Sequence, residues 1–142
     1  MHRPLLILVI LSLALPGCGG TDPPEATKAT ANWVMQLGGS VRLPGKTQNV
    51  KSVDELPEEG YQIERVILNE TKVKDDDLKQ LAGLKNLRSL SLYRTDVTDS
   101  AVDHILPLSR LEELELSYTR VTDEGISKLR NMPRLQKLFL YG

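Results

Sequence analysis

The second half of the sequence repeats at an interval of 24 residues, and this repeat constrains the fold more than any other feature. Apolar residues recur in an L-x-x-L-x-L pattern, whose alternation is typical of a short strand with one buried side. The three apolar columns are Ile63, Leu87, Leu111 and Leu135; Val66, Leu90, Leu114 and Leu138; and Leu68, Leu92, Leu116 and Leu140. Because so short a unit cannot bury its apolar side alone, we expect neighbouring units to stack.

A T-x-V-T-D segment follows the strand pattern, as in Thr119 to Asp123, and an apolar helix-like pattern comes after it. We expect the Thr119 hydroxyl to bond a loop backbone group and Val121 to face the core. Thr122 or Asp123 is expected to cap the following helix, and Asp123 is the more consistent cap, because Lys74 stands in the column of Thr122 while the aspartate column is kept. A catalytic Thr-Asp pair is disfavoured, since it would need an orienting group and would not recur once per unit.

The combined pattern, L-x-x-L-x-L-x-x-T-x-V-T-D, resembles the leucine-rich repeat, in the 24-residue form that carries Thr where many members carry Asn or Cys. The resemblance covers residues 61–142, as three full units plus a terminal partial strand. It implies an α/β solenoid with a parallel sheet on the concave face and short helices on the convex face. For function the resemblance implies only a non-catalytic interaction role.

The N-terminus predicts an export signal at residues 1–17, with Arg3 followed by the apolar run LLILVILSLAL. This run is shorter than the roughly 20 residues that span a bilayer. The only cysteine, Cys18, ends an L-P-G-C segment that resembles the lipobox of bacterial lipoproteins, which implies acylation of Cys18 after cleavage. Residues 18–22 would then be a tether. The protein would be exported and lipid-anchored at the cell membrane or outer membrane, in the periplasm or on the cell surface. Ordinary secretion with a free thiol is the alternative.

Residues 23–60 do not follow the repeat and suit an N-terminal cap for the array. Apolar spacings of three and four predict a helix over 23–37, with Asp22 as its N-cap and the Glu25 carboxylate reaching back. Short strands are expected at 40–43 and 48–53, on either side of a Pro-Gly turn, followed by a loop over 55–60.

Composition argues against several functional classes. The 18 Lys and Arg residues nearly balance the 19 Asp and Glu residues, and charges of both signs are spread along the chain. A nucleic-acid partner is therefore not expected. Asp75, Asp76 and Asp77 lack the alternating spacing of a calcium loop and suit the first turn of a helix. His104 falls on the exposed side of a helix, without a second ligand or a catalytic partner. We therefore expect no enzyme activity, cofactor or metal.

The concave strand face is the expected binding surface, because four of the six aromatic residues fall on it with arginine nearby. Strand faces also favour aromatic residues in general, and Glu113 with Lys137 could be an ordinary cross-strand pair. The candidate contact residues are Arg65, Ile67, Asn69, Tyr93, Arg94, Glu113, Glu115, Tyr118, Lys137, Phe139 and Tyr141.

The expected partner is another protein of the cell envelope, and a structural spacer role in a larger envelope assembly is the alternative. The sequence stops within a strand pattern, at LQKLFLYG, where a repeat array would need a polar cap. Three explanations stay open: a fragment of a longer array, a minimal protein, or an end closed by another chain. End-to-end self-association at this uncapped C-terminus is a further expectation.

Overall fold

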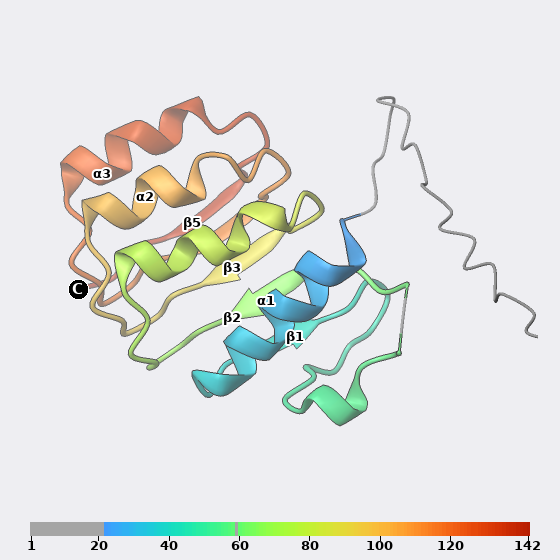
Figure 1. Cartoon of the computed structure of the whole chain (residues 1–142). Coiled ribbons are helices and arrows are strands. Elements are labelled where there is room, and N and C mark those ends of the chain that lie inside the picture. The colour runs from blue at the N-terminus through green and yellow to red at the C-terminus, as the bar shows by residue number, and fades with distance from the viewer. Residues whose placement is uncertain (1–21, 59) are drawn as a thin grey trace, which may run out of the picture.

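The computed structural model describes residues 22–58 and 60–142, which form a single five-stranded sheet with helices packed on one face (Figure 1). The strands are short and follow one another across the sheet in chain order. They are β1 (Ser40–Arg42), β2 (Arg65–Ile67), β3 (Ser89–Ser91), β4 (Glu113–Glu115) and β5 (Lys137–Phe139). The predicted export signal, Cys18 and most of the tether lie outside the described residues.

The helical elements form the second layer. They are α1 (Pro24–Gln36), η1 (Val53–Glu55), η2 (Asp75–Gly83), α2 (Asp99–Ile105), α3 (Asp123–Lys128) and η3 (Leu129–Asn131). In Figure 1, η2, α2 and α3 lie side by side over the sheet, and α1 continues the layer over β1. The chain is therefore an α/β protein with a mostly parallel sheet.

The strand register follows the 24-residue columns of the sequence. Strands β2 to β5 are parallel, and Val66, Leu90, Leu114 and Leu138 pair in one row across them. This register places the same repeat position of each segment side by side, so side chains of one column lie along one row of the sheet. The predicted strands and their alignment are confirmed.

The core lies between the sheet and the helix layer. The first three members of each strand column are buried, as are Val73 and Val97 from the turns and Leu78 and Ile105 from the helices. Burial decreases toward β5, where Leu135 and Leu138 are half-buried and Leu140 is 47 % exposed. Strand β5 pairs only with β4 within the described chain, so its outer edge and adjoining core are open.

The first helix begins as expected, but its predicted cap is wrong. Pro23 occupies the N-cap position of α1, and no side chain caps the helix. Asp22 instead turns away, and its Oδ1 accepts hydrogen bonds from the backbone N–H groups of Lys85 and Asn86. Asp22 thus fastens the beginning of the described chain to the turn before β3.

The segment after α1 covers the first edge of the sheet with an antiparallel strand. Strand β1 pairs antiparallel with β2, and Val41 also forms a bridge with Val50. The strand predicted over 48–53 is wrong, because only Val50 makes this bridge and Val53 begins the 3₁₀ helix η1. Gly39 makes the approach to β2 possible: a Cβ placed there would lie 2.5 Å from the Ile67 carbonyl oxygen.

The first threonine of each T-x-V-T-D segment closes the turn after its strand. The hydroxyl groups of Thr71, Thr95 and Thr119 each donate to the backbone carbonyl three residues earlier, at 2.7 Å. Hydroxyl-to-backbone bonds of this kind satisfy carbonyls that the ladder leaves free. The predicted role of these hydroxyls is confirmed, and Val121 is half-buried at the open end of the core.

The preferred aspartate caps are wrong, because threonine, the other candidate, caps the helices and aspartate has another role. Thr98 and Thr122 are the N-cap residues, and their hydroxyls accept from Ser100 N and Glu124 N. Asp75 and Asp99, at the next column position, accept hydrogen bonds from the threonine of the following unit. Asp75 accepts from the backbone N–H and hydroxyl of Thr98 at 2.7 Å each, so the bond joins neighbouring units.

Candidate functional site

Most of the predicted contact residues lie on the open face of the sheet, which is the face not covered by helices. The row formed by Arg65, Ser89, Glu113 and Lys137 crosses β2 to β5 as predicted. Glu113 is the centre of a charge cluster in this row. Its carboxylate accepts from Arg65 at 2.8 Å and from Lys137 at 2.6 Å.

The charge cluster stabilises the ionised form of its carboxylate. The hydrogen bond from Lys137 lowers the pKa of Glu113, assisted by the charge of Arg65 and opposed by partial desolvation. Because the side chains of Arg65 and Lys137 are 34 % and 60 % exposed, solvent screens the pair and its net effect on stability is small. This end of the open face is therefore polar, and its charges are largely matched.

Four candidate residues farther along the strands contribute less to a common site: Ile67, Asn69, Glu115 and Phe139. Ile67 on β2 is half-buried, and Phe139 on β5 is 41 % exposed. Glu115 folds back on its own strand, where its carboxylate accepts from the backbone N–H of Ser117. Asn69 accepts from the Ser91 hydroxyl at 2.5 Å. Glu115 and Asn69 are therefore engaged by neighbouring groups of the sheet.

Three candidate residues form a compact cluster where the strands end. The rings of Tyr93 and Tyr118 meet edge to face, with centroids 5.5 Å apart and planes at 87°. The Arg94 guanidinium carbon lies 5.3 Å from the Tyr93 centroid and 5.5 Å from the Tyr118 centroid. A cation over two π-faces and a T-shaped ring pair are both favourable arrangements. We call these three residues the Tyr-Arg cluster.

The backbone beneath the cluster is held in an unusual conformation. Glu70, Arg94 and Tyr118 occupy the same repeat position, and their φ angles are 57°, 52° and 56°. This left-handed region costs a residue with a Cβ roughly 1–2 kcal/mol, and glycine is its usual occupant. The turn therefore directs long side chains outward at a position where glycine would relieve the strain.

The end of the described chain continues the aromatic surface. Tyr118 N donates to the Tyr141 carbonyl at 2.7 Å, and a Cβ placed at Gly142 would lie 2.8 Å from Cδ1 of the Tyr118 ring. Tyr118 is 51 % exposed and Tyr141 is 68 % exposed. The Tyr-Arg cluster and Tyr141 thus share one edge of the sheet, whereas Glu113 lies about 15 Å back along the strands.

Sequence reasoning missed Arg42, Arg88 and Glu112, which line a shallow hollow of about 180 Å³ beside the charge cluster. Arg42 reaches this place because β1 runs antiparallel and pairs Arg42 with Arg65. No repeat column could have predicted that pairing, since residues 40–42 lie outside the 24-residue register. Arg88 and Glu112 precede β3 and β4 and lie 3.7 Å apart.

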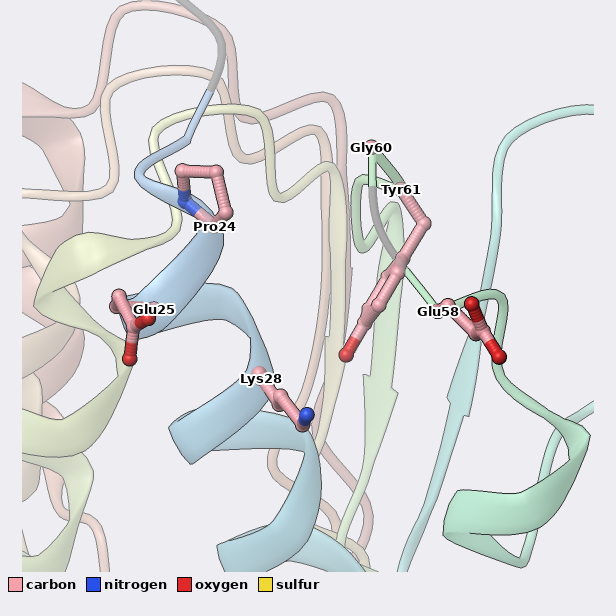
Figure 2. Close-up of a pocket in the computed structure, with 6 residues that line it drawn as sticks. All are labelled: Pro24, Glu25, Lys28, Glu58, Gly60 and Tyr61. Atoms are coloured by element: carbon pink, nitrogen blue, oxygen red, sulfur yellow. The ribbon is translucent and has the colours of Figure 1, made fainter. Parts of the chain in front are cut away.

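A second hollow lies between α1 and the chain leading into β2, away from the open face (Figure 2). Its volume is about 270 Å³, and the Tyr61 hydroxyl points into it toward α1. That hydroxyl is buried without a hydrogen-bond partner among residues 22–58 and 60–142, and burial raises the pKa of Tyr61. The lining residues are Pro24, Glu25, Lys28, Glu58, Gly60 and Tyr61. This set has carboxylates and a lysine but no nucleophile with an oriented base.

The aspartate run at 75–77 is used by the fold. Asp75 binds Thr98, Asp77 accepts from Lys74 N, and the side chain of Asp76 is 93 % exposed. His104 lies 3.7 Å from Asp76 on the outer side of α2. Across the described residues, no three His, Cys, Asp or Glu side chains gather in a way that could hold a metal ion.

The fold and the site define an α/β protein with a polar open sheet face and an aromatic edge. A scan of known family models finds none that matches the chain, and a search of curated proteins also finds no match. Within the part of the chain that the structure describes, every helix is too short or too polar to cross a membrane.

Proposed function

We propose that the chain is a lipid-anchored leucine-rich-repeat protein of the cell envelope, which binds another protein through its open sheet face. The 24-residue register of β2 to β5 and the Asp-Thr bonds between units support the solenoid part of the proposal. The L-P-G-C segment supports the anchor. On this account the open face is the concave surface of the solenoid, and the protein has no catalytic role.

The Tyr-Arg cluster is the observation that carries the binding role. Tyrosine and arginine are the residues most enriched in the energetic centres of protein interfaces, because they combine a large rigid area with polar groups. Here the Arg94 guanidinium carbon already lies within 5.5 Å of the centroids of both tyrosine rings, so binding would cost little side-chain entropy. The strained backbone at Arg94 and Tyr118 is consistent with a displayed surface, since strain often accompanies functional positions.

A structural spacer role is the second candidate, and the exposed side of β5 favours it. Phe139, Leu140 and Tyr141 are all more than 40 % exposed beside an open strand edge. A further repeat of a longer chain or a second copy of this one would cover these residues by adding a strand. In that case the open face would need no ligand.

Affinity purification from membranes that contain the tagged full chain separates the two roles. We expect the Tyr93→Ala, Tyr118→Ala double variant to recover its partner at least tenfold less well than the unaltered chain. The matched control is Asp103→Ala with Lys128→Ala, which removes an exposed ion pair on the helix side. Equal recovery by all three proteins would contradict recognition through the Tyr-Arg cluster.

Metabolic labelling with a palmitate analogue tests the anchor separately. We expect the full chain to incorporate the label and Cys18→Ser to incorporate none. A labelled Cys18→Ser variant, or an unlabelled parent chain, would contradict acylation at this residue.

A further inference from the structure

The beginning of the described chain is fixed at one particular edge of the sheet. Asp22 is 2 % exposed, and its Oδ1 lies 2.6 Å from Lys85 N and 3.2 Å from Asn86 N, in the turn that leads into β3. Because β2 to β5 are parallel, the turns that lead into them lie along this same edge. Figure 1 shows the blue start of α1 beside the turns that follow η2 and α2. We call this the strand-entry edge.

The strand-entry edge is basic. The turns into β3, β4 and β5, residues 84–88, 108–112 and 130–136, carry five cations and one carboxylate. The cations are Lys85, Arg88, Arg110, Arg130 and Arg134, and all except the half-buried Arg110 are exposed. The carboxylate of Glu112 is half-buried and lies 3.7 Å from Arg88, and Glu64 is the half-buried acidic residue before β2. Glu25, Lys28 and Glu58 lie farther along, at the hollow beside α1.

The opposite edge, where the strands end and the helices begin, is acidic. Residues 69–77, 93–99 and 117–124 contain eight carboxylates and four cations. The carboxylates are Glu70, Asp75, Asp76, Asp77, Asp96, Asp99, Asp123 and Glu124, and the cations are Lys72, Lys74, Arg94 and Arg120. The repeat units are therefore polarised from a basic edge to an acidic edge.

We propose that the strand-entry edge rests on an anionic phospholipid surface and sets the orientation of the protein on its membrane. The inference rests on the lipid anchor of the proposed function. Three residues separate Cys18 from Asp22, so the four Cα-to-Cα steps between them can span at most about 14 Å. An acyl group on Cys18 would thus keep the strand-entry edge close to the headgroups. There each Lys or Arg strengthens binding to an anionic leaflet about fivefold.

This orientation places the two edges of the molecule in different surroundings. The Tyr-Arg cluster lies roughly seven residues along the strand from the entry turns, which corresponds to about 23 Å. The acidic edge would be repelled by the same lipids that attract the basic one. The open sheet face would then stand upright on the membrane, with its aromatic edge toward a partner.

Hydrogen-deuterium exchange of the membrane-bound protein tests the orientation. The full chain would be expressed in a bacterial host, purified from its membranes and reconstituted on phosphatidylcholine vesicles with or without 30 mol% phosphatidylglycerol. On the anionic vesicles we expect amides in 84–88, 108–112 and 130–136 to exchange at least about fivefold more slowly than on the neutral ones. Amides in 93–98 and 117–122 should not change. About 0.5 M salt should remove the difference.

Charge reversal supplies the matched comparison. Lys85→Glu with Arg134→Glu should abolish the added protection, whereas Lys72→Glu with Arg120→Glu, the same charge change at the opposite edge, should keep it. Equal protection at both edges, or no difference between the two vesicles, would overturn the inference.

Failure of the anchor can be told apart from failure of the orientation. Mass analysis of the purified chain shows whether Cys18 is acylated. If it is not, the proposed anchor fails, and residues 18–142, which contain the whole described fold, would be coupled through the Cys18 thiol to a maleimide lipid. The same exchange pattern on these vesicles would support the basic edge as a membrane-facing surface, and its absence would overturn it.

Discussion

The Asp99 carboxylate holds Thr122 of the following unit with two hydrogen bonds. Oδ1 accepts from the Thr122 backbone N–H and Oδ2 accepts from the Thr122 hydroxyl, each at 2.7 Å. The same hydroxyl also accepts from Glu124 N at the start of α3. One threonine thus caps its own helix while it binds the aspartate of the unit before it. Asp75 and Thr98 repeat the arrangement.

The Asp99 bond predicts a specific dependence of stability on pH. The hydrogen bonds from Thr122 lower the pKa of Asp99 below its usual value of 3.8. The stabilisation is therefore fully present above the unfolded-state pKa and is lost as the pH falls through the lower folded-state pKa. Urea denaturation between pH 6 and pH 2.5 should show a smaller acid loss of stability in Asp99→Asn than in the unaltered chain.

Asp123 is the control for this experiment, because it occupies the same column but receives no threonine hydrogen bond in the described structure. We expect Asp123→Asn to retain the acid-dependent loss of the unaltered chain. Identical pH profiles for Asp99→Asn and the unaltered chain would contradict the assigned role of the carboxylate.

Asp75, which binds Thr98, should contribute more to the free energy of unfolding than the neighbouring Asp76. Asp75→Ala leaves the backbone N–H of Thr98 without its acceptor, so we expect the free energy of unfolding to fall by about 2 kcal/mol. Asp76→Ala, at a side chain that is 93 % exposed, should change it by less than about 0.5 kcal/mol. Denaturant unfolding of both variants measures the difference, and equal losses would rule out the proposed bond between units.

The repeat columns predicted the strands well because alternating burial belongs to each strand by itself. Leu90 and Leu92 are buried, whereas Ser91 between them lies on the open face, as a period of two requires. The columns also predicted the strand register, because residues at the same repeat position pair when the units are equal in length. The same columns correctly placed Arg65, Glu113 and Lys137 in one row.

The helix caps were mispredicted because the relevant bond joins two units. Comparing columns within each unit favoured Asp75 over Lys74 as the cap, since only the aspartate recurs in all three units. The threonine position needs an aspartate from the preceding unit, and the first unit has none before it. Lys74 can therefore stand there, and its backbone N–H is bound by Asp77 of its own segment. The repeat columns could not predict the pairings of β1 either, because β1 lies outside the 24-residue register.

The left-handed turn at Glu70 predicts a stabilising substitution. Glu70 has a φ of 57° and an exposed side chain, so glycine would relieve backbone strain at little cost. We expect Glu70→Gly to raise the free energy of unfolding by about 1 kcal/mol. Glu70→Ala keeps the strained Cβ and should bring no gain. A thermal melt in which the two variants behave alike would show that the turn is not strained.

The close approach at Gly39 predicts the opposite result. A Cβ there would lie 2.5 Å from the Ile67 carbonyl oxygen and 2.9 Å from Val34 Cγ1, so Gly39→Ala must push α1 away from β2. We expect a loss of about 2 kcal/mol on denaturant unfolding. Gly38→Ala has open space around its Cβ but a φ of +84°, so only backbone strain of about 1 kcal/mol should appear. A larger loss for Gly38→Ala would contradict the packing argument.

Site-specific photocrosslinking in living cells tests the proposed binding surface most directly. A photoreactive residue placed at Tyr118, on the Tyr-Arg cluster, is compared with one at Asp103, on the outer side of α2. We predict a discrete protein adduct at position 118 that is absent at position 103 and is lost when Tyr93→Ala is added. Adducts of the same mass and yield from both positions, or no adduct from position 118, would contradict recognition through the aromatic edge of the sheet.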